Sequence, residues 1–212
     1  MRFLALGRLQ AEENGEAIPL GGQRQRAVLA LLLLNAGRPV PIDRIVLEIW
    51  PDQPVGRVRD SLYTYVSQLR KALGKDRIVR AGGGYRLDLA DGDEIDAVVF
   101  ERSADRARRL LGSDPEAAAH LFDLGLGLWR GRPYEGFEDL PSSVPEVARL
   151  DEMRVSAAED RIEAELGAGG TPVAGDVEKL CEEHPYRERL WGLLARTLYR
   201  AGRQVEALHT FT

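Results

Sequence analysis

Residues 57–86 read RVRDSLYTYVSQLRKALGKDRIVRAGGGYR, and the rest of the chain is interpreted outward from this stretch. In its first half, apolar residues recur every three or four positions, which predicts a helix with one buried face. These residues are Val58, Leu62, Tyr65, Val66, Leu69 and Leu73. Gly74 follows them at a place where helices commonly end. The second half predicts two short strands that are joined by three glycines and flanked by Arg80 and Arg86.

A helix followed by a small basic hairpin is the arrangement of a winged helix-turn-helix protein. The face of the helix opposite its apolar stripe is polar, with Arg70 at its border; it carries Arg57, Asp60, Tyr63, Thr64, Ser67, Gln68 and Lys71. Basic, hydroxyl and amide side chains are those that reach phosphates and base edges in a major groove. Residues 57–86 hold eight Lys and Arg against two acids. The stretch therefore predicts a DNA-binding surface.

Two plainer interpretations of the same residues stay open. A helix with a polar face is often only a solvated surface helix. The three glycines resemble a phosphate-binding loop, but the stretch lacks both the GxGxxG spacing and the lysine and serine that follow a nucleotide loop.

Charge is divided unevenly along the 212 residues. Residues 1–90 hold 14 Lys and Arg and 9 Asp and Glu, a net charge of +5. Residues 91–212 hold 15 and 25, a net charge of −10. The overall charge of −5 therefore conceals a basic half and an acidic half. This asymmetry predicts a basic binding module joined to a module with a different use.

Cysteine content and hydropathy limit the cellular locations that the sequence is compatible with. The single cysteine, Cys181, excludes an internal disulfide and fits a reducing cytoplasm; its place beside Val177 and Leu180 predicts a packed thiol. The N-terminus lacks the pattern of a signal peptide, and the longest apolar run, Ala27 to Leu34, is too short to span a bilayer. We therefore expect a cytoplasmic protein without membrane contact.

The chain before the central helix predicts a small sheet and two helices. Phe3 to Leu6 and Ala17 to Leu20 are strand candidates on either side of an Asn14-Gly15 turn. Gln23 to Ala36 predicts a strongly apolar helix. Ile42 to Ile49 predicts a shorter one, after an extended link with two prolines. The polar stretch 90–94 predicts a domain boundary.

Beyond residue 94 no segment has a convincing strand pattern, so we expect helices only. Asp114 and Pro115 are typical of a helix start, and Gly125 lies on the apolar face of that helix. A helix pair at the end of the chain matches the tetratricopeptide repeat through Trp191, Leu194, Ala195, Ala207 and Phe211, with Leu198 in place of a tyrosine. The chain stops at Thr212 inside a predicted helix, which suggests a fragment of a longer protein.

Six motifs, in their order and spacing, carry a family resemblance: residues 1–7 (MRFLALG), 25–32 (QRAVLALL), 37–40 (GRPV), 65–74 (YVSQLRKALG), 84–87 (GYRL) and 184–191 (HPYRERLW). With them the chain resembles the Streptomyces antibiotic regulatory protein family. The resemblance implies an OmpR-type winged helix at 1–92, formed by an N-terminal β-sheet, three helices and a wing hairpin, so this part is of the α+β class. It also implies an all-α, tetratricopeptide-like bacterial transcriptional activator domain at 93–212, truncated at its C-terminal end.

The resemblance implies an activator of secondary-metabolite genes that binds direct repeats in double-stranded promoter DNA as a dimer. Its implied protein partner is RNA polymerase, through the sigma factor or the alpha or beta subunits. We expect Tyr63, Thr64 and Ser67 near base edges, and Arg57, Arg59, Arg70 and Lys71 on phosphates. We expect Arg80 and Arg86 to bind DNA from the wing. Family resemblance alone indicates Asp52, Gln53 and Val55 for the polymerase contact, and a plain connector is the alternative there.

One residue does not fit this interpretation, and other classes of protein compete with it. Asp60 departs from the pattern, because an acid on the groove face repels phosphate. Its carboxylate could accept a hydrogen bond from the amino group of a cytosine, or it could hold an arginine in place. An enzyme is disfavoured, because His120, His184 and His209 are scattered and no nucleophile–base pair stands out. We expect no catalytic residue, metal or cofactor. A protein-interaction module whose winged helix binds a partner protein, or a repressor of the same architecture, remains an alternative.

Overall fold

A computed structural model describes residues 1–210. The chain divides into two units. Unit 1 comprises Met1–Val99 and Leu128–Asp151, and unit 2 comprises Phe100–Gly127 and Glu152–Thr212. Each unit is described by itself below. The boundary predicted at residues 92/93 stays a prediction.

The N-terminal sheet of unit 1 has four short strands in the order β3-β2-β1-β7. They are β1 (Arg2–Leu4), β2 (Gln10–Glu13), β3 (Glu16–Ala17) and β7 (Glu94–Ile95). The Asn14-Gly15 turn between β2 and β3 is confirmed, because both residues have positive φ (53° and 84°), as a tight hairpin turn requires.

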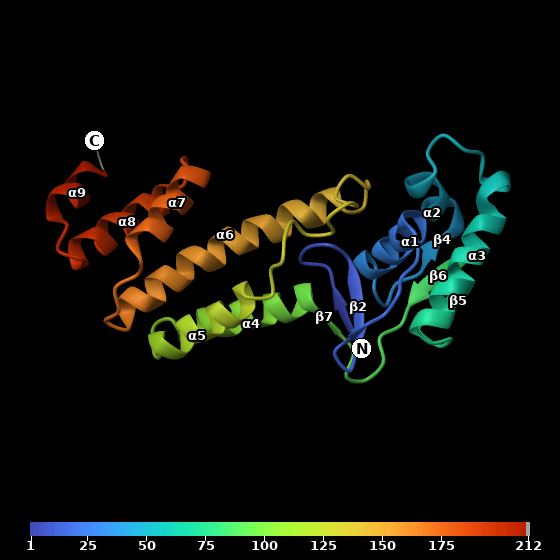
Figure 1. Ribbon diagram of the computed structural model, residues 1–212, viewed down its shortest axis with the longest axis horizontal. Helices are drawn as coiled ribbons and strands as arrows, with labels where there is room; N and C mark the ends of the chain where they lie inside the picture. The colour runs from blue at the N-terminus through green and yellow to red at the C-terminus, as the bar shows by residue number, and fades with distance from the viewer. Residues whose placement is uncertain (211–212) are drawn as a thin grey trace. The chain divides into compact units, whose positions relative to one another are not determined.

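Three helices and a second sheet complete the winged helix of unit 1 (Figure 1). The helices are α1 (Gln23–Leu34), α2 (Ile42–Ile49) and α3 (Val55–Leu73), and the sheet has the order β4-β6-β5. β4 is Val40–Pro41, β5 is Ile78–Ala81 and β6 is Gly84–Leu87. α1 is buried on nearly all sides, so burial of its leucines stabilises the whole unit.

The apolar stripe of α3 packs inward as predicted. Val58, Leu62, Val66, Leu69 and Leu73 are all buried. Tyr65 is half-buried, and its ring stacks on that of Trp50 with 6.1 Å between centroids. The predicted fold class is therefore confirmed for this unit.

One expectation about the region from residue 94 onward is wrong. Helices only were expected there, but a strand is present: β7 pairs with β1 in parallel, with Phe3 opposite Ile95. Residues 130–137 hydrogen-bond to the segment that directly follows β1. The backbone N–H groups of Arg130 and Tyr134 donate to the carbonyls of Leu6 (2.8 Å) and Ala5 (2.7 Å).

A buried ion pair anchors the start of β7. Asp93 accepts two hydrogen bonds from Arg77, both of 2.9 Å, and one of 2.9 Å from the N–H of Ala90. The amino group of Met1 also donates to it, at 3.0 Å. The hydrogen bonds from Arg77 hold the pKa of Asp93 well below its usual range, although burial acts in the opposite direction.

We expect Asp93→Asn to lower the stability of unit 1 at pH 7. A folded-state pKa below the unfolded value means that the carboxylate contributes fully above about pH 4, and that its contribution is lost as the pH falls below that value. The difference between wild type and variant in urea denaturation should therefore shrink between pH 6 and pH 3. A difference that is constant over this range would contradict the assignment.

Unit 2 is helical, which confirms the predicted class of this part. Its helices are α4 (Asp96–Leu110, whose first residues belong to unit 1), α5 (Pro115–Leu126), α6 (Val144–Gly167, from Glu152 onward), α7 (Ala174–Glu183), α8 (Glu188–Arg200) and α9 (Gln204–His209). The Asp114 carboxylate caps α5 by accepting from the N–H of Ala117 at 3.1 Å. A Cβ on Gly125 would meet Phe100 and Ser103 at 3.3 Å, so α4 and α5 approach each other closely at this glycine.

The 184–191 motif has a structural explanation in unit 2. Arg187 pairs with the buried Glu159 (3.1 Å), and Arg189 pairs with the buried Asp160 (2.7 Å). Together they tie the start of α8 to the middle of α6. Removal of one partner of such a pair leaves a buried charge, so these arginines hold the helix array together.

The helix pair at the end of the chain packs as predicted where it is described. Leu194, Ala195, Leu198 and Ala207 are buried between α8 and α9, whereas Phe211 lies outside the described residues. Cys181 is buried as expected, and burial raises the pKa of its thiol to about 11. Within residues 1–210 no helix has both the length and the apolar character needed to cross a membrane.

Candidate DNA-binding interface

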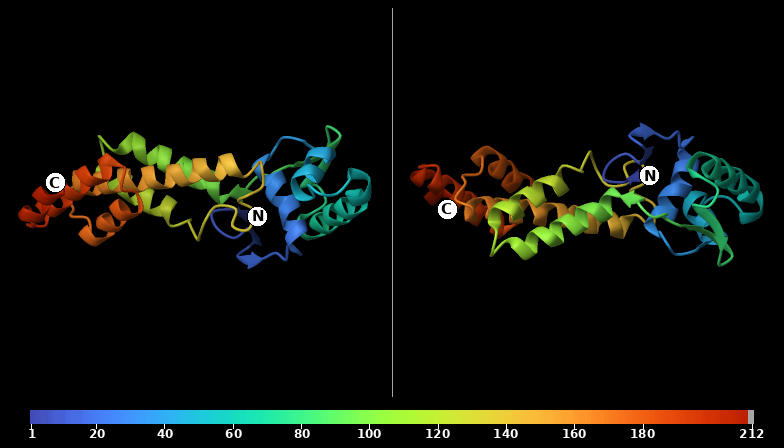
Figure 2. Two further views of the ribbon diagram at one scale, coloured as in Figure 1. Left: turned by 90° about the horizontal axis from the view of Figure 1, so that it is seen from above. Right: turned by 90° about the horizontal axis from the view of Figure 1, so that it is seen from below.

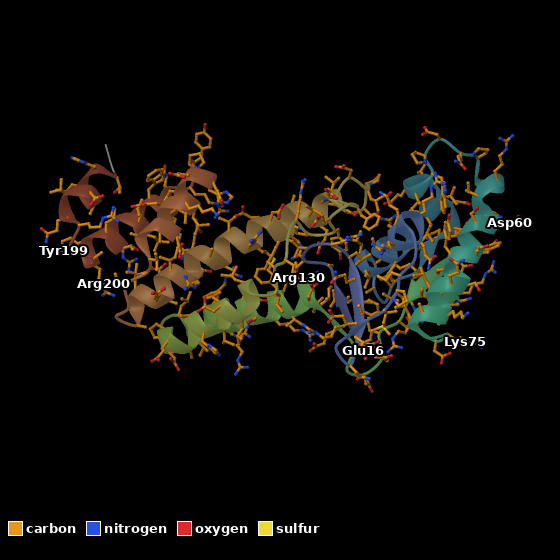
Figure 3. All side chains as sticks on the ribbon, viewed as in Figure 1. Glu16, Asp60, Lys75, Arg130, Tyr199 and Arg200 are labelled. Atoms are coloured by element: carbon orange, nitrogen blue, oxygen red, sulfur yellow. The ribbon has the colours of Figure 1, made fainter. Side chains whose placement is uncertain are left out.

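The polar face of α3 is open to solvent. Arg57, Arg59, Asp60, Thr64, Ser67 and Lys71 are exposed, and Tyr63 is 36% exposed. Asp60, labelled on α3 in Figure 3, lies among them. Because the opposite stripe packs inward, every turn of the helix presents polar side chains outward. The structure thus brings the predicted base-reading and phosphate-binding residues of α3 onto one surface.

The cations of this surface differ in how far they are already engaged. Arg57 and Lys71 have no ion pair or side-chain hydrogen bond to any described residue. Arg59 is 3.3 Å from Asp43, and because both side chains are exposed this pair is worth little in water. These three side chains are therefore available to a polyanion.

Asp60 does not hold an arginine in place, since it makes no ion pair within residues 1–210. Its backbone carbonyl instead accepts a hydrogen bond of 2.9 Å from the Thr64 hydroxyl, one turn later. The carboxylate is left exposed. Acceptance of a hydrogen bond from a base amino group stays a prediction for this carboxylate.

The wing is a tight hairpin beside α3 (Figure 2). β5 and β6 pair antiparallel with Arg80 opposite Tyr85, and the turn between them uses Gly82 (φ +56°) and Gly83 (φ +72°). Two successive positive φ angles suit the right-handed twist of the strands and favour glycine at both positions. The triple glycine therefore builds a turn, not a nucleotide loop.

The two wing arginines behave differently. Arg80 is exposed, and its guanidinium lies 5.9 Å from the ring centroid of Tyr63 on α3. Arg86 is half-buried and makes two hydrogen bonds to Asp88, of 2.5 and 2.7 Å. The Arg86 hydrogen bond lowers the pKa of the Asp88 carboxyl, and the same contact raises the pKa of Arg86. Only Arg80 presents a charge with no acidic partner among the described residues.

Arg70 is also engaged within the fold. Its Nε donates a 2.6 Å hydrogen bond to the carbonyl of Ile78, and its guanidinium lies 5.6 Å from the ring centroid of Tyr85. It is half-buried, unlike Lys71 beside it. The assignment of Arg70 and Arg86 to DNA stays a prediction. Both guanidinium groups already make contacts within the fold.

The loop before α3 is exposed from Pro51 to Pro54. Asp52 and Gln53 are accessible there, while the side chain of Val55 lies outside what the structure describes. Trp50, which is buried, anchors the loop at its start. The polymerase contact predicted for this loop is not tested by its exposure.

Sequence reasoning missed one buried polar residue that holds the unit together. Asp96, 3% exposed, accepts hydrogen bonds from the N–H groups of Ala5 (2.7 Å) and Ala97 (2.8 Å) and from the Arg130 guanidinium (3.2 Å). Its position after a polar boundary gave no local signal of this role. Figure 3 labels Arg130, which comes from the segment after α5.

No group of three or more His, Cys, Asp or Glu side chains in residues 1–210 is placed to hold a metal ion. The exposed groups of α3 and the wing are suited to binding a polyanion by charge and hydrogen bonds. They do not form a nucleophile–base pair.

Two family models match the chain. One is described as "Bacterial transcriptional activator domain" and matches residues 95–212; the other is described as "Transcriptional regulatory protein, C terminal" and matches residues 15–87.

Individual relatives agree with these models. The chain is 36% identical over 217 residues to transcriptional regulatory protein EmbR of Mycobacterium tuberculosis, a match that covers 99% of this chain and 56% of EmbR. It is 33% identical over 227 residues to regulatory protein DnrI of Streptomyces peucetius, covering 100% of this chain and 82% of DnrI. The chain spans about half the length of the EmbR relatives that it matches.

A solved structure shows the same fold. Mycobacterium tuberculosis EmbR, in complex with a low affinity phosphopeptide, matches with a TM-score of 0.90 at 33% identity, over 99% of this chain and 57% of that chain. The family models, the relatives and the fold agree with the motifs quoted above, and the chain belongs to the Streptomyces antibiotic regulatory protein family of transcriptional regulators, with an OmpR-type winged helix and a bacterial transcriptional activator domain.

Proposed function

We propose that this protein is a transcriptional activator that binds double-stranded promoter DNA through α3 and the β5–β6 wing. The observation that carries the proposal is the exposed face of α3, where Arg57 and Lys71 have no acidic partner among the described residues and Arg80 of the wing lies beside Tyr63. A helix of this kind fits the major groove, and a neighbouring hairpin reaches the adjacent backbone or minor groove.

Side-chain chemistry divides the surface into two roles. We assign Arg57, Arg59, Lys71 and Arg80 to phosphates, which bind cations without regard to sequence. We assign Tyr63, Thr64 and Ser67 to base edges. The Thr64 hydroxyl is oriented by its bond to the carbonyl of Asp60, so its position on the helix is fixed before DNA arrives.

Family membership supports the remaining parts of the proposal. These are binding to direct repeats as a dimer, control of secondary-metabolite genes, and recruitment of RNA polymerase through its sigma, alpha or beta subunits. For the polymerase we propose the exposed loop with Asp52, Gln53 and Val55.

We expect the protein to bind DNA taken from upstream of the genes that neighbour its own gene. This binding should weaken steeply as the salt concentration rises. Each phosphate contact contributes roughly one unit to the slope of log K against log salt. We expect Arg57→Ala and Lys71→Ala each to reduce the magnitude of that slope by about one unit, on every DNA sequence tested. Fluorescence anisotropy at four salt concentrations measures it. Lys179→Ala, in an exposed lysine of α7, is the matched control and should leave the slope unchanged.

Equal slopes for wild type and both α3 variants would show that this face does not bind phosphate. In contrast, Ser67→Ala should cost about 1–3 kcal/mol on one operator and relax the preference at a single base position. Run-off transcription from a bound promoter then separates an activator from a repressor, because the amount of transcript rises in one case and falls in the other.

A further inference from the structure

Two arginine–tyrosine contacts run in opposite directions between α3 and the wing. Arg70 of α3 lies over the ring of Tyr85 in β6, at 5.6 Å from its centroid. Arg80 of β5 lies over the ring of Tyr63 in α3, at 5.9 Å. Each element thus supplies one cation and one ring to the other. A cation within about 6 Å of an aromatic centroid is attracted by the ring quadrupole.

Arg70 makes a second contact with the wing that Arg80 does not match. Its Nε donates a 2.6 Å hydrogen bond to the carbonyl of Ile78, the first residue of β5. Hydrogen bonds from ionised donors are stronger than neutral ones, and a planar guanidinium can donate and stack at the same time. The side chain therefore joins the last turn of α3 to both strands of the hairpin.

The four side chains form one cluster. Tyr85 is buried, and burial raises the pKa of its hydroxyl. The charges of Arg80 and Arg70 act against that rise, while Tyr63 adds to it. These effects of the neighbouring side chains on the pKa of Tyr85 agree with the two ring contacts.

We propose that Arg70 is a positioning residue that fixes the wing against α3, and that the two crossed arginine–tyrosine contacts set the angle between the two DNA-binding elements. This inference rests on the proposed function, since a fixed angle matters only if both elements bind one duplex. It changes the role expected for Arg70, which is to orient the wing and not to hold a phosphate.

Lysine is the substitution that separates the two roles. A phosphate contact needs only a positive charge, so Arg70→Lys would keep the salt slope and most of the affinity. A positioning contact needs the planar guanidinium with its Nε–H, which a lysine ammonium does not reproduce. Arg70→Lys should then behave like Arg70→Ala.

The experiment measures DNA affinity and salt slope for wild type, Arg70→Ala, Arg70→Lys and the control Lys71→Ala, on protein shown to be folded by circular dichroism. We expect both Arg70 variants to bind about tenfold more weakly, the size of one lost hydrogen bond to a charged group, with the wild-type slope. Lys71→Ala should lose about one unit of slope.

A double-mutant cycle measures the coupling between Arg70 and Arg80 in DNA binding. A purely structural role of Arg70 would leave this coupling at zero. If Arg70 places the wing, removal of Arg80 should cost less in the Arg70→Ala background than in wild type. The matched cycle of Lys71 with Arg80 should be additive. An additive Arg70–Arg80 cycle, or an Arg70→Lys variant with wild-type affinity, overturns the proposal.

Hydrogen exchange without DNA tests the positioning separately from the proposed function. Both Arg70 variants should exchange the amides of β5 and β6 faster than wild type, and Lys71→Ala should not. If wild type shows no salt-dependent DNA binding, the proposed function fails, whatever the exchange data show. If wild type binds DNA but hairpin exchange is unchanged in both Arg70 variants, only the positioning role fails.

Discussion

Gly84→Ala should destabilise unit 1 by more than about 3 kcal/mol, an effect reserved for severe steric conflicts. A Cβ at this position would lie 1.8 Å from the carbonyl oxygen of Val40 and 2.7 Å from the Cα of Pro41. Both neighbours are backbone, so no side-chain rotation relieves the overlap. β4 and β6 pair at this point, with Gly84 opposite Pro41. The variant therefore has to separate the two strands, and the wing loses its support.

Gly56→Ala provides the matched control. Gly56 lies in the first turn of α3, a Cβ there meets nothing within 4 Å, and its φ is outside the left-handed region. Alanine should be neutral or stabilise by about 0.5–1 kcal/mol, because it restricts the unfolded chain. Urea denaturation followed by tryptophan fluorescence measures both variants. Similar midpoints for the two alanine variants would show that the strands do not approach as closely as the structure has them.

Elements with a strong local signal were predictable from the sequence. The α3 helix follows from an apolar spacing that continues over more than four turns, and the wing follows from glycines that are typical of a tight turn. The Asn14-Gly15 turn belongs to the same group. In each case the residues that determine the element lie within a few positions of one another.

The contacts that hold unit 1 together were not predictable in this way. β7 has two residues, too few for a periodic pattern, and its partner β1 lies about ninety positions earlier in the chain. Residues 130–137 meet the residues just after β1 across an even longer separation. No local pattern encodes such a pairing, because it depends on the tertiary fold.

Charge counting overestimated the free cations of the candidate site. Of the eight basic residues in 57–86, Arg70, Arg77 and Arg86 are engaged by a carbonyl or a carboxylate within the fold, and Arg59 forms an exposed pair with Asp43. Composition records the sign of a charge but not its partner. The DNA surface is therefore narrower than the sequence suggested, with Arg57, Lys71 and Arg80 as its main unpaired charges among the described residues.

Asp96→Ala should lower the free energy of unfolding of unit 1 by about 3–5 kcal/mol, the cost of breaking a buried ion pair from one side. The carboxylate accepts from the backbone N–H groups of Ala5, Leu6 and Ala97 and from the Arg130 guanidinium. Alanine leaves the three backbone N–H groups buried without this acceptor. Arg130 keeps its hydrogen bonds to the Arg8 carbonyl and to Gln10, so the main loss falls on the backbone groups.

Asp96→Asn separates charge from shape. The amide has nearly the same size, but its NH2 group faces donors where the carboxylate oxygen accepted, so we expect a loss of about 2 kcal/mol, intermediate between wild type and alanine. Asp91→Ala, at an exposed turn position, should change stability by less than about 0.5 kcal/mol. Urea denaturation ranks the three variants. If Asp96→Ala ranked with Asp91→Ala, the end of β1, the start of α4 and residues 130–137 would have to be joined by contacts other than this carboxylate.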